Sequence, residues 1–274
     1  MQCEIHGLPA YAYTGGKAFD PARPAIVLIH GAQNDHSVWA LQSRYLAHHG
    51  YAVLAPDLPG HGRSAGPALA SVEAMADWIL ALLAAAGVRR ALLAGHSMGS
   101  LVALETAARA PQLAAGLALL GTTYPMKVSD TLLETARSDE GAAIDMVNIW
   151  SHSSIAHKPS FPGPGFSVMG GARRLMQRMS ARNPHQLFHT DFAACNGYAG
   201  GEAAAAALDC PVLFVLGKKD VMTPPRSTAL LTGAVKHGTI LSVDAGHQMM
   251  AEASDAVREG LAAFAAKLPF QESP

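Results

Sequence analysis

One serine of the chain has the surroundings of a nucleophile. Ser97 stands in the segment GHSMG at 95–99, directly after the apolar run 91–94 and before a helical pattern. Glycines on both sides of the serine permit a sharp strand-to-helix turn that exposes the hydroxyl above the sheet. The helix N-terminus beneath it favours developing negative charge. The spacing predicts that Ser97 attacks a carbonyl carbon, against the alternative that it only caps the helix.

A serine hydroxyl needs a base to take its proton, and the base needs an acid to orient it. His247 follows the last predicted strand, and Asp220 follows the strand before it. Because the carboxyl ends of parallel strands meet at one edge of a sheet, we expect both side chains to lie near Ser97. Asp244 is the alternative acid, since it stands three residues before His247.

An oxyanion formed on the substrate needs two backbone donors. The N–H of Met98, the residue after the serine, is the first candidate. We expect the second from Ala32, in the loop after the apolar run 25–29. Gln33 and Asn34 in the same loop either point polar groups into the substrate pocket or make local turns.

Short apolar runs alternate with helical patterns along the chain. Runs that are apolar on both faces, as buried parallel strands are, occupy 25–29, 52–55, 91–94, 117–120, 212–216 and 239–243. Helical patterns occupy 38–49, 71–86, 97–110, 226–235 and 251–267. Residues 2–5 and 10–14 could form an antiparallel pair at the sheet edge. The alternation predicts an α/β fold with a mostly parallel, eight-stranded sheet flanked by helices.

One segment interrupts this alternation. Residues 122–202 contain no clear buried strand, but they have helical patterns at 129–150 and 171–181 and a Gly/Pro-rich stretch at 159–165. We expect an inserted helical lid, with a mobile lip at the Gly/Pro-rich stretch, on a core formed by 1–121 and 203–274. Met126, Trp150 and Met169 would line the substrate pocket, or would simply pack the lid onto the core.

Composition excludes several classes of protein. Half of the residues are hydrophobic, 15% are charged and the net charge is −1, so neither nucleic acid nor an anionic membrane surface is an expected partner. The three cysteines are too scattered for a disulfide framework, and no signal-peptide or membrane-span pattern is present, which favours a cytoplasmic protein. We expect a small-molecule substrate, no metal and no cofactor; a homodimer is possible.

Five segments together resemble the lid-bearing serine hydrolases of the α/β-hydrolase superfamily. They are HGAQNDHSVW from His30, PDLPGHGRS from Pro56, GHSMGS from Gly95, GKKDVMTPP from Gly217 and DAGHQM from Asp244. The resemblance covers nearly the whole chain. It implies the α/β-hydrolase fold, the same three catalytic residues as above, and a structural role for the loop 57–64.

The reaction that fits these residues is hydrolysis of a carboxylic ester of a small, largely apolar substrate through an acyl-enzyme. A carbon–carbon or thioester bond could be cleaved by the same three residues. A ligand-binding or receptor-like member of the fold with slow turnover is an alternative of another class. Haloalkane dehalogenases and epoxide hydrolases use an aspartate where Ser97 stands, so both reactions are excluded.

Overall fold

The computed structural model describes residues 1–153, 168–183 and 186–270. In this part of the chain an eight-stranded sheet has the order β1-β2-β4-β3-β5-β6-β7-β8. The strands are β1 (Gln2–Ile5), β2 (Leu8–Tyr13), β3 (Ala25–Ile29), β4 (Ala52–Pro56), β5 (Ala91–His96), β6 (Ala114–Leu120), β7 (Val212–Gly217) and β8 (Gly238–Val243). Only β1 and β2 run antiparallel to their neighbours; the rest are parallel. The predicted fold class is confirmed.

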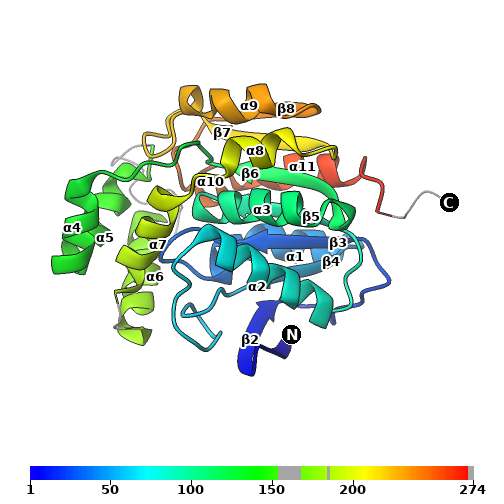
Figure 1. Cartoon of the computed structure of the whole chain (residues 1–274), viewed down its shortest axis with the longest axis horizontal. Helices are drawn as coiled ribbons and strands as arrows, with labels where there is room; N and C mark the ends of the chain where they lie inside the picture. The colour runs from blue at the N-terminus through cyan, green and yellow to red at the C-terminus, as the bar shows by residue number, and fades with distance from the viewer. Residues whose placement is uncertain (154–167, 184–185, 271–274) are drawn as a thin grey trace.

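Helices cover both faces of the sheet (Figure 1). One face carries α2 (Val72–Ala85), α3 (Met98–Arg109), α8 (Gly201–Ala206) and α9 (Ala229–Ala234). The other carries α1 (Ala40–His48), α10 (Met249–Glu252) and α11 (Ser254–Ala265). Three short 3-10 turns, η1 (His36–Trp39), η2 (Pro111–Leu113) and η3 (Pro225–Thr228), join these elements. None of the helices in the described ranges is long and apolar enough to cross a membrane.

Alternate residues of the central strands enter two different cores. Val27 and Ile29 of β3 pack under the α2–α3 face, whereas Ile26 and Leu28 pack under the α1–α11 face. All four are fully buried, as expected of a parallel strand with helices above and below. The edge strand β8 departs from this pattern, and its Ile240 is 56% exposed.

Four of the helices described between β6 and β7 gather at the carboxyl edge of the sheet (Figure 1). We call them the helical insertion: α4 (Asp130–Ser138), α5 (Glu140–Trp150), α6 (Val168–Arg182) and α7 (Leu187–Gly197). They share a small core of their own, to which Ile144, Met176 and Phe188 contribute. The insertion therefore lies over the edge where the site residues were expected.

The insertion differs in detail from the sequence prediction. The pattern at 129–150 is two helices, because Asp139 ends α4 and its carboxylate accepts the Ala142 N–H at the start of α5. The helices α7 and α8 were not predicted. The Gly/Pro-rich stretch 159–165, predicted to be a mobile lip, lies outside the described residues.

Candidate active site

Ser97 occupies the turn between β5 and α3 with a φ of +52°, a left-handed conformation that is uncommon outside glycine. The two flanking glycines are sterically required. A methyl group on Gly95 would collide with the Gly99 carbonyl, and one on Gly99 would collide with the backbone at Ile29 and His30. The helix can thus start directly above the strand, and the serine is held at the carboxyl edge of the sheet.

His247 and Asp220 meet at this edge. Nδ1 of His247 lies 2.8 Å from Oδ2 of Asp220, and both side chains are buried. Thr223 donates its hydroxyl to the same Asp220 oxygen at 2.7 Å. The other oxygen, Oδ1, accepts the backbone N–H groups of Met222 and Thr223 at 2.9 and 2.8 Å. The carboxylate is therefore fixed in orientation, and Nε2 is the ring nitrogen of His247 that is left for chemistry.

Burial alone would raise the pKa of the Asp220 carboxyl. The positive character of His247 and the hydrogen bonds from His247 and Thr223 outweigh that cost, and the pKa lies below its usual value. Asp244, the alternative acid, lies elsewhere: its carboxylate contacts the Lys219 ammonium at 3.0 Å and its side chain is 71% exposed. The geometry thus favours Asp220 as the partner of His247.

His96 and Gly121 also contact His247 and fix its position. Nε2 of His96 donates to the His247 carbonyl oxygen at 2.9 Å, and the two rings lie 4.6 Å apart. Burial, followed by the nearby His247, lowers the pKa of His96 to about 3, so His96 is neutral. Gly121 at the end of β6 has a φ of +53°, and a methyl group there would lie 3.1 Å from Nδ1 of His247. A larger residue than glycine would displace the imidazole.

The loop after β3 lies against the Ser97 turn. A methyl group on Gly31 would lie 3.2 Å from Cβ of Ser97. Nδ1 of His30 donates to the Gly31 carbonyl oxygen at 2.9 Å, and Nε2 accepts the Leu58 N–H at 3.1 Å. The Gly31 carbonyl and the Ala32 N–H belong to the same trans peptide, so they point in opposite directions. Because the carbonyl oxygen faces His30, the Ala32 N–H points away from His30.

His30 is held neutral in this arrangement. Burial, and then the charge of His61, lowers its pKa to about 4. The neutral ring is the form that can donate from one nitrogen and accept at the other. Met98, the other predicted donor, is the first residue of α3, and its N–H has no partner within the helix.

A cavity of about 180 Å³ opens beside Ser97 and His247. Its wall is mostly apolar, and among the described residues that line it Lys127 alone carries a full charge. The lining residues are Ala32, Ser97, Met126, Lys127, Val128, Ser129, Leu132, Trp150, Phe192, Cys195, Val221, Met222, Thr223 and His247. Met126 and Trp150, two of the residues predicted to line the substrate pocket, are among them. A narrow extension of about 20 Å³ is lined by Asn34, together with Ser97 and His247.

Two predicted pocket residues lie away from this cavity. Met169 is in the first turn of α6 and is not part of the lining. Gln33 is fully buried, and its amide nitrogen faces Glu140, Met176 and Ser180 of the helical insertion. These contacts turn the side chain into the insertion and away from the cavity. Asn34 uses its amide to donate to the Ala32 carbonyl oxygen at 2.8 Å.

Several residues of the site were missed by the sequence analysis. Phe192 and Cys195 reach the cavity from α7, a helix that was not predicted. The spacing of Phe188, Phe192 and Cys195 on one face of a helix would have indicated it. Thr223 was not predicted, because its spacing from Asp220 resembles that of an ordinary turn and gives no sign of a contact with the site.

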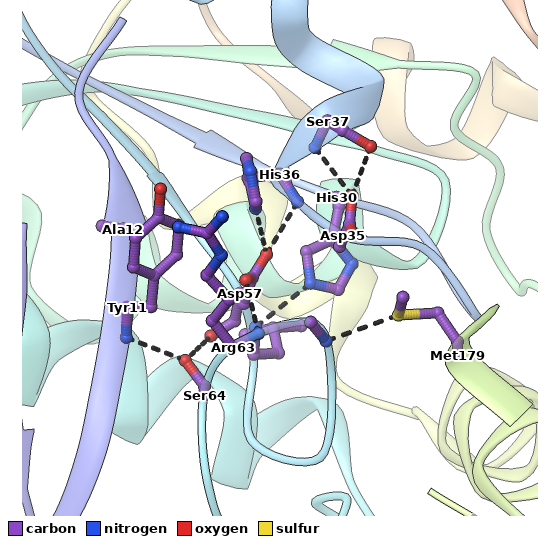
Figure 2. A network of polar contacts seen from close by, with 12 residues as sticks. Tyr11, Ala12, His30, Asp35, His36, Ser37, Asp57, Arg63, Ser64 and Met179 are labelled. Carbon is purple, nitrogen blue, oxygen red and sulfur yellow. Dashed lines mark hydrogen bonds and ion pairs between the residues drawn. The ribbon is translucent and has the colours of Figure 1, made fainter. Parts of the chain in front are cut away.

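Asp57 lies at the centre of a polar network next to the loop 30–34, which we call the oxyanion loop because it contains the predicted donor Ala32 (Figure 2). Its carboxylate accepts the N–H and the ring Nδ1 of His36, both at 2.8 Å, and the Arg63 N–H at 2.8 Å. Asp35, His36 and Asp57 bring possible metal ligands within 4.8 Å of one another. Because backbone and ring donors occupy the Asp57 carboxylate, we assign Asp57 a role in holding the loop 57–64.

Comparisons with known proteins agree with this architecture. The family model described as "alpha/beta hydrolase fold" matches residues 24–148. An "(E)-2-((N-methylformamido)methylene)succinate hydrolase" of Acinetobacter baylyi is 24% identical over 89% of this chain and 91% of its own. A "putative carbamate hydrolase RutD" of Klebsiella pneumoniae is 24% identical over 89% of this chain and 93% of its own.

Solved structures have the same fold over nearly the whole chain. An enol-lactonase from Burkholderia xenovorans superposes with a TM-score of 0.83 at 22% identity, covering 97% of this chain and 100% of its own. A thermophilic esterase from Thermogutta terrifontis gives a TM-score of 0.81 at 21% identity, covering 97% and 98%.

The chain has the α/β-hydrolase fold, as the sequence motifs predicted, and the family model of that fold matches residues 24–148. Both relatives at 24% identity are named as hydrolases.

Proposed function

We propose that the protein hydrolyses a carboxylic ester of a small, largely apolar substrate through an acyl-enzyme. The observation that carries the proposal is the fixed His247–Asp220 pair, 2.8 Å apart, beside a serine held at +52° in a strand-to-helix turn. Ser97 and His247 line the same cavity. These are the nucleophile, base and orienting acid that acyl transfer requires.

In the proposed mechanism His247 takes the proton of the Ser97 hydroxyl as the oxygen attacks the ester carbonyl carbon. The N–H groups of Met98 and Ala32 stabilise the oxyanion of the tetrahedral intermediate. The C–O bond to the alcohol breaks, and His247 gives its proton to the departing oxygen. Water, activated by the same imidazole, then attacks the acyl-enzyme and releases the carboxylic acid. Asp220 keeps the ring proton on Nδ1 throughout.

The cavity supports the choice of substrate. Its small volume and apolar wall favour a short acyl or alcohol group over a long or highly charged one. Relatives and structural neighbours are named as carbamate, enol-lactone and ester hydrolases, so cyclic esters and carbamates belong beside open esters in the substrate panel. Thioesters and ring-fission dienones test the remaining alternatives.

Two further parts of the prediction remain proposals. We propose that the helical insertion acts as a lid, because α4, α5 and α7 supply Leu132, Trp150 and Phe192 to the cavity wall. We propose a cytoplasmic location, which is supported by the three free cysteines. A small-molecule substrate is the only partner that the site calls for, and a homodimer stays a prediction.

The test is Ser97→Ala assayed with p-nitrophenyl acetate and butyrate, and with a fluorophosphonate probe. Turnover and labelling should both be lost while the melting temperature is retained. Ser138→Ala is the matched control, because Ser138 is an exposed serine at the end of α4 and should leave both unchanged. Wild-type activity in the Ser97 variant would overturn the proposal. Binding of esters without turnover or labelling in the wild type would favour the receptor-like alternative.

A further inference from the structure

Gln33 connects the oxyanion loop to the helical insertion. Its N–H donates to Oδ2 of Asp191 on α7 at 2.7 Å. Its side-chain Nε2 lies 3.0 Å from Oε1 of Glu140 on α5 and 2.8 Å from Oγ of Ser180 on α6. Gln33 has a φ of +55°, a conformation that a non-glycine residue keeps only where its surroundings hold it. Three insertion helices supply those surroundings.

The peptide between Ala32 and Gln33 is held at both of its polar ends. The Ala32 carbonyl oxygen accepts from Nδ2 of Asn34 at 2.8 Å, and the Gln33 N–H donates to Asp191. The orientation of this peptide sets the ψ angle of Ala32. The N–H of Ala32, one of the two proposed oxyanion donors, belongs to the adjacent peptide and is oriented through it.

Asp191 is itself fixed by an ion pair beneath the loop. Nε2 of His61 lies 2.9 Å from Oδ2 of Asp191, and Nδ1 of His61 lies 3.1 Å from the Pro59 carbonyl oxygen. Because both ring nitrogens face acceptors, His61 is an imidazolium. Both members of the pair are almost completely buried. The other groups near the ring are neutral His30, at 4.8 Å between centroids, and the Asp57 carboxylate.

Burial on its own would lower the pKa of His61. The charge of Asp191 and the hydrogen bond to it outweigh burial, so the pKa of His61 is raised. The second oxygen of Asp191, Oδ1, is buried with no hydrogen-bond partner in the described part of the chain. Burying a carboxylate that has one oxygen without a partner lowers the stability of the fold, and an apolar residue at this position of α7 would pack without that loss. We therefore look for a role of Asp191 in the contacts of its other oxygen, Oδ2, with Gln33 and His61.

We propose that Asp191, held by His61, is a positioning residue that sets the geometry of the oxyanion hole. The carboxylate fixes the Ala32–Gln33 peptide and through it the Ala32 N–H. The hole is therefore complete only when α7 is docked on the loop. The inference rests on the proposed function, in which Ala32 supplies an oxyanion donor, and it adds a residue of the insertion that touches neither substrate nor triad.

The experiment compares Asp191→Ala, Asp191→Asn and the control Asp145→Ala. Asp191→Ala should lower kcat for p-nitrophenyl butyrate roughly ten- to hundredfold with KM unchanged, because a misplaced donor weakens the transition state alone. Asp191→Asn keeps an acceptor for the Gln33 N–H and should recover most of the loss. Asp145→Ala breaks an exposed ion pair with Arg173 between α5 and α6, and should leave kcat unchanged.

Hydrogen exchange of the Gln33 amide gives a readout independent of activity. Exchange should accelerate in Asp191→Ala and stay slow in Asp191→Asn and Asp145→Ala. Each kcat is normalised to the number of serines labelled at the endpoint by fluorophosphonate. If Asp191→Ala does not fold, Asp191→Leu replaces it, because leucine removes the acceptor of the Gln33 N–H but fills the space of the aspartate; the same loss of kcat at constant KM is expected.

Several outcomes would overturn the inference. They are an unchanged kcat in the folded variant, an equal loss in Asp145→Ala, and unchanged exchange of the Gln33 amide. If the wild type hydrolyses no ester at all, the proposed function fails. The exchange measurement then still decides whether Asp191 holds the loop.

Discussion

Replacing Asp220 by asparagine tests the most constrained contact of the site. The two oxygens of Asp220 have different partners: Oδ1 accepts two backbone N–H groups, and Oδ2 accepts from His247 and from the Thr223 hydroxyl. In Asp220→Asn the amide oxygen must face the two backbone donors. The NH₂ group must then face His247. The opposite orientation would leave two buried N–H groups without an acceptor, at about 1–3 kcal/mol each.

The forced orientation has a chemical consequence. Opposite an NH₂ group, Nδ1 of His247 must accept, so the ring proton moves to Nε2. An Nε2 that carries a proton cannot take one from Ser97. By analogy with the same change in other serine hydrolases, kcat should fall about 10⁴-fold, which corresponds to about 5 kcal/mol of transition-state stabilisation.

The assay is steady-state hydrolysis of p-nitrophenyl butyrate together with the rate of fluorophosphonate labelling. Both rates should fall, while the melting temperature changes little because the side chains have nearly the same shape. Asp244→Asn is the control, since Asp244 was the alternative acid and its carboxylate faces Lys219. A variant at Asp220 that keeps more than about a tenth of the wild-type kcat would refute the reasoning, as would a large loss in Asp244→Asn.

Two further predictions concern the groups around the imidazole. Burial lowers the pKa of His30 to about 4 and of His96 to about 3, so the unfolded chain binds more protons than the folded one below about pH 6.5. The free energy of unfolding should therefore fall from there to about pH 4. The raised pKa of His61 stabilises the fold in full below pH 6.5, and that stabilisation is lost only as the pH rises above it. Thermal melts at intervals across this range check it, and a flat profile in wild type and His96→Gln alike would contradict it. Gly121→Ala should lower kcat roughly tenfold and destabilise the fold by about 1–2 kcal/mol, because the methyl group meets His247 at a positive φ; wild-type kinetics would exclude the contact.

The parallel core could be predicted from the sequence because its signals are local. Strands such as β3 and β5 are continuous apolar runs that end at a glycine or histidine, and periodicity alone places them. The order of the site residues along the chain then places Ser97, Asp220 and His247 at one edge, since successive parallel strands end on the same side. In the parallel core, the edge at which a site residue lies therefore follows from its position directly after a strand in the sequence.

The insertion could not be predicted in the same way. Helices α5, α6 and α7 bury their apolar faces mainly against one another, so their register depends on partners that are distant in the chain. Gln33 illustrates the difficulty: a glutamine beside an oxyanion donor fits a pocket residue as well as a bracing residue. Only the positions of Glu140 and Ser180, more than one hundred residues away, decide between the two roles.

The charge states of two adjacent buried histidines could not be predicted from the sequence. His30 and His61 are the same residue type, both are buried, and their rings lie 4.8 Å apart. His30 accepts a backbone N–H and must keep a lone pair, whereas His61 faces a carbonyl and a carboxylate and must carry two protons. Each state favours the other, because two adjacent imidazolium rings would repel. Asp191 determines which ring is charged, so a carboxylate on α7 fixes the neutral tautomer of His30 that orients the Gly31–Ala32 peptide. The proposed oxyanion hole is in this sense assembled by the fold as a whole, and the motif around Ser97 supplies only one of its two proposed donors.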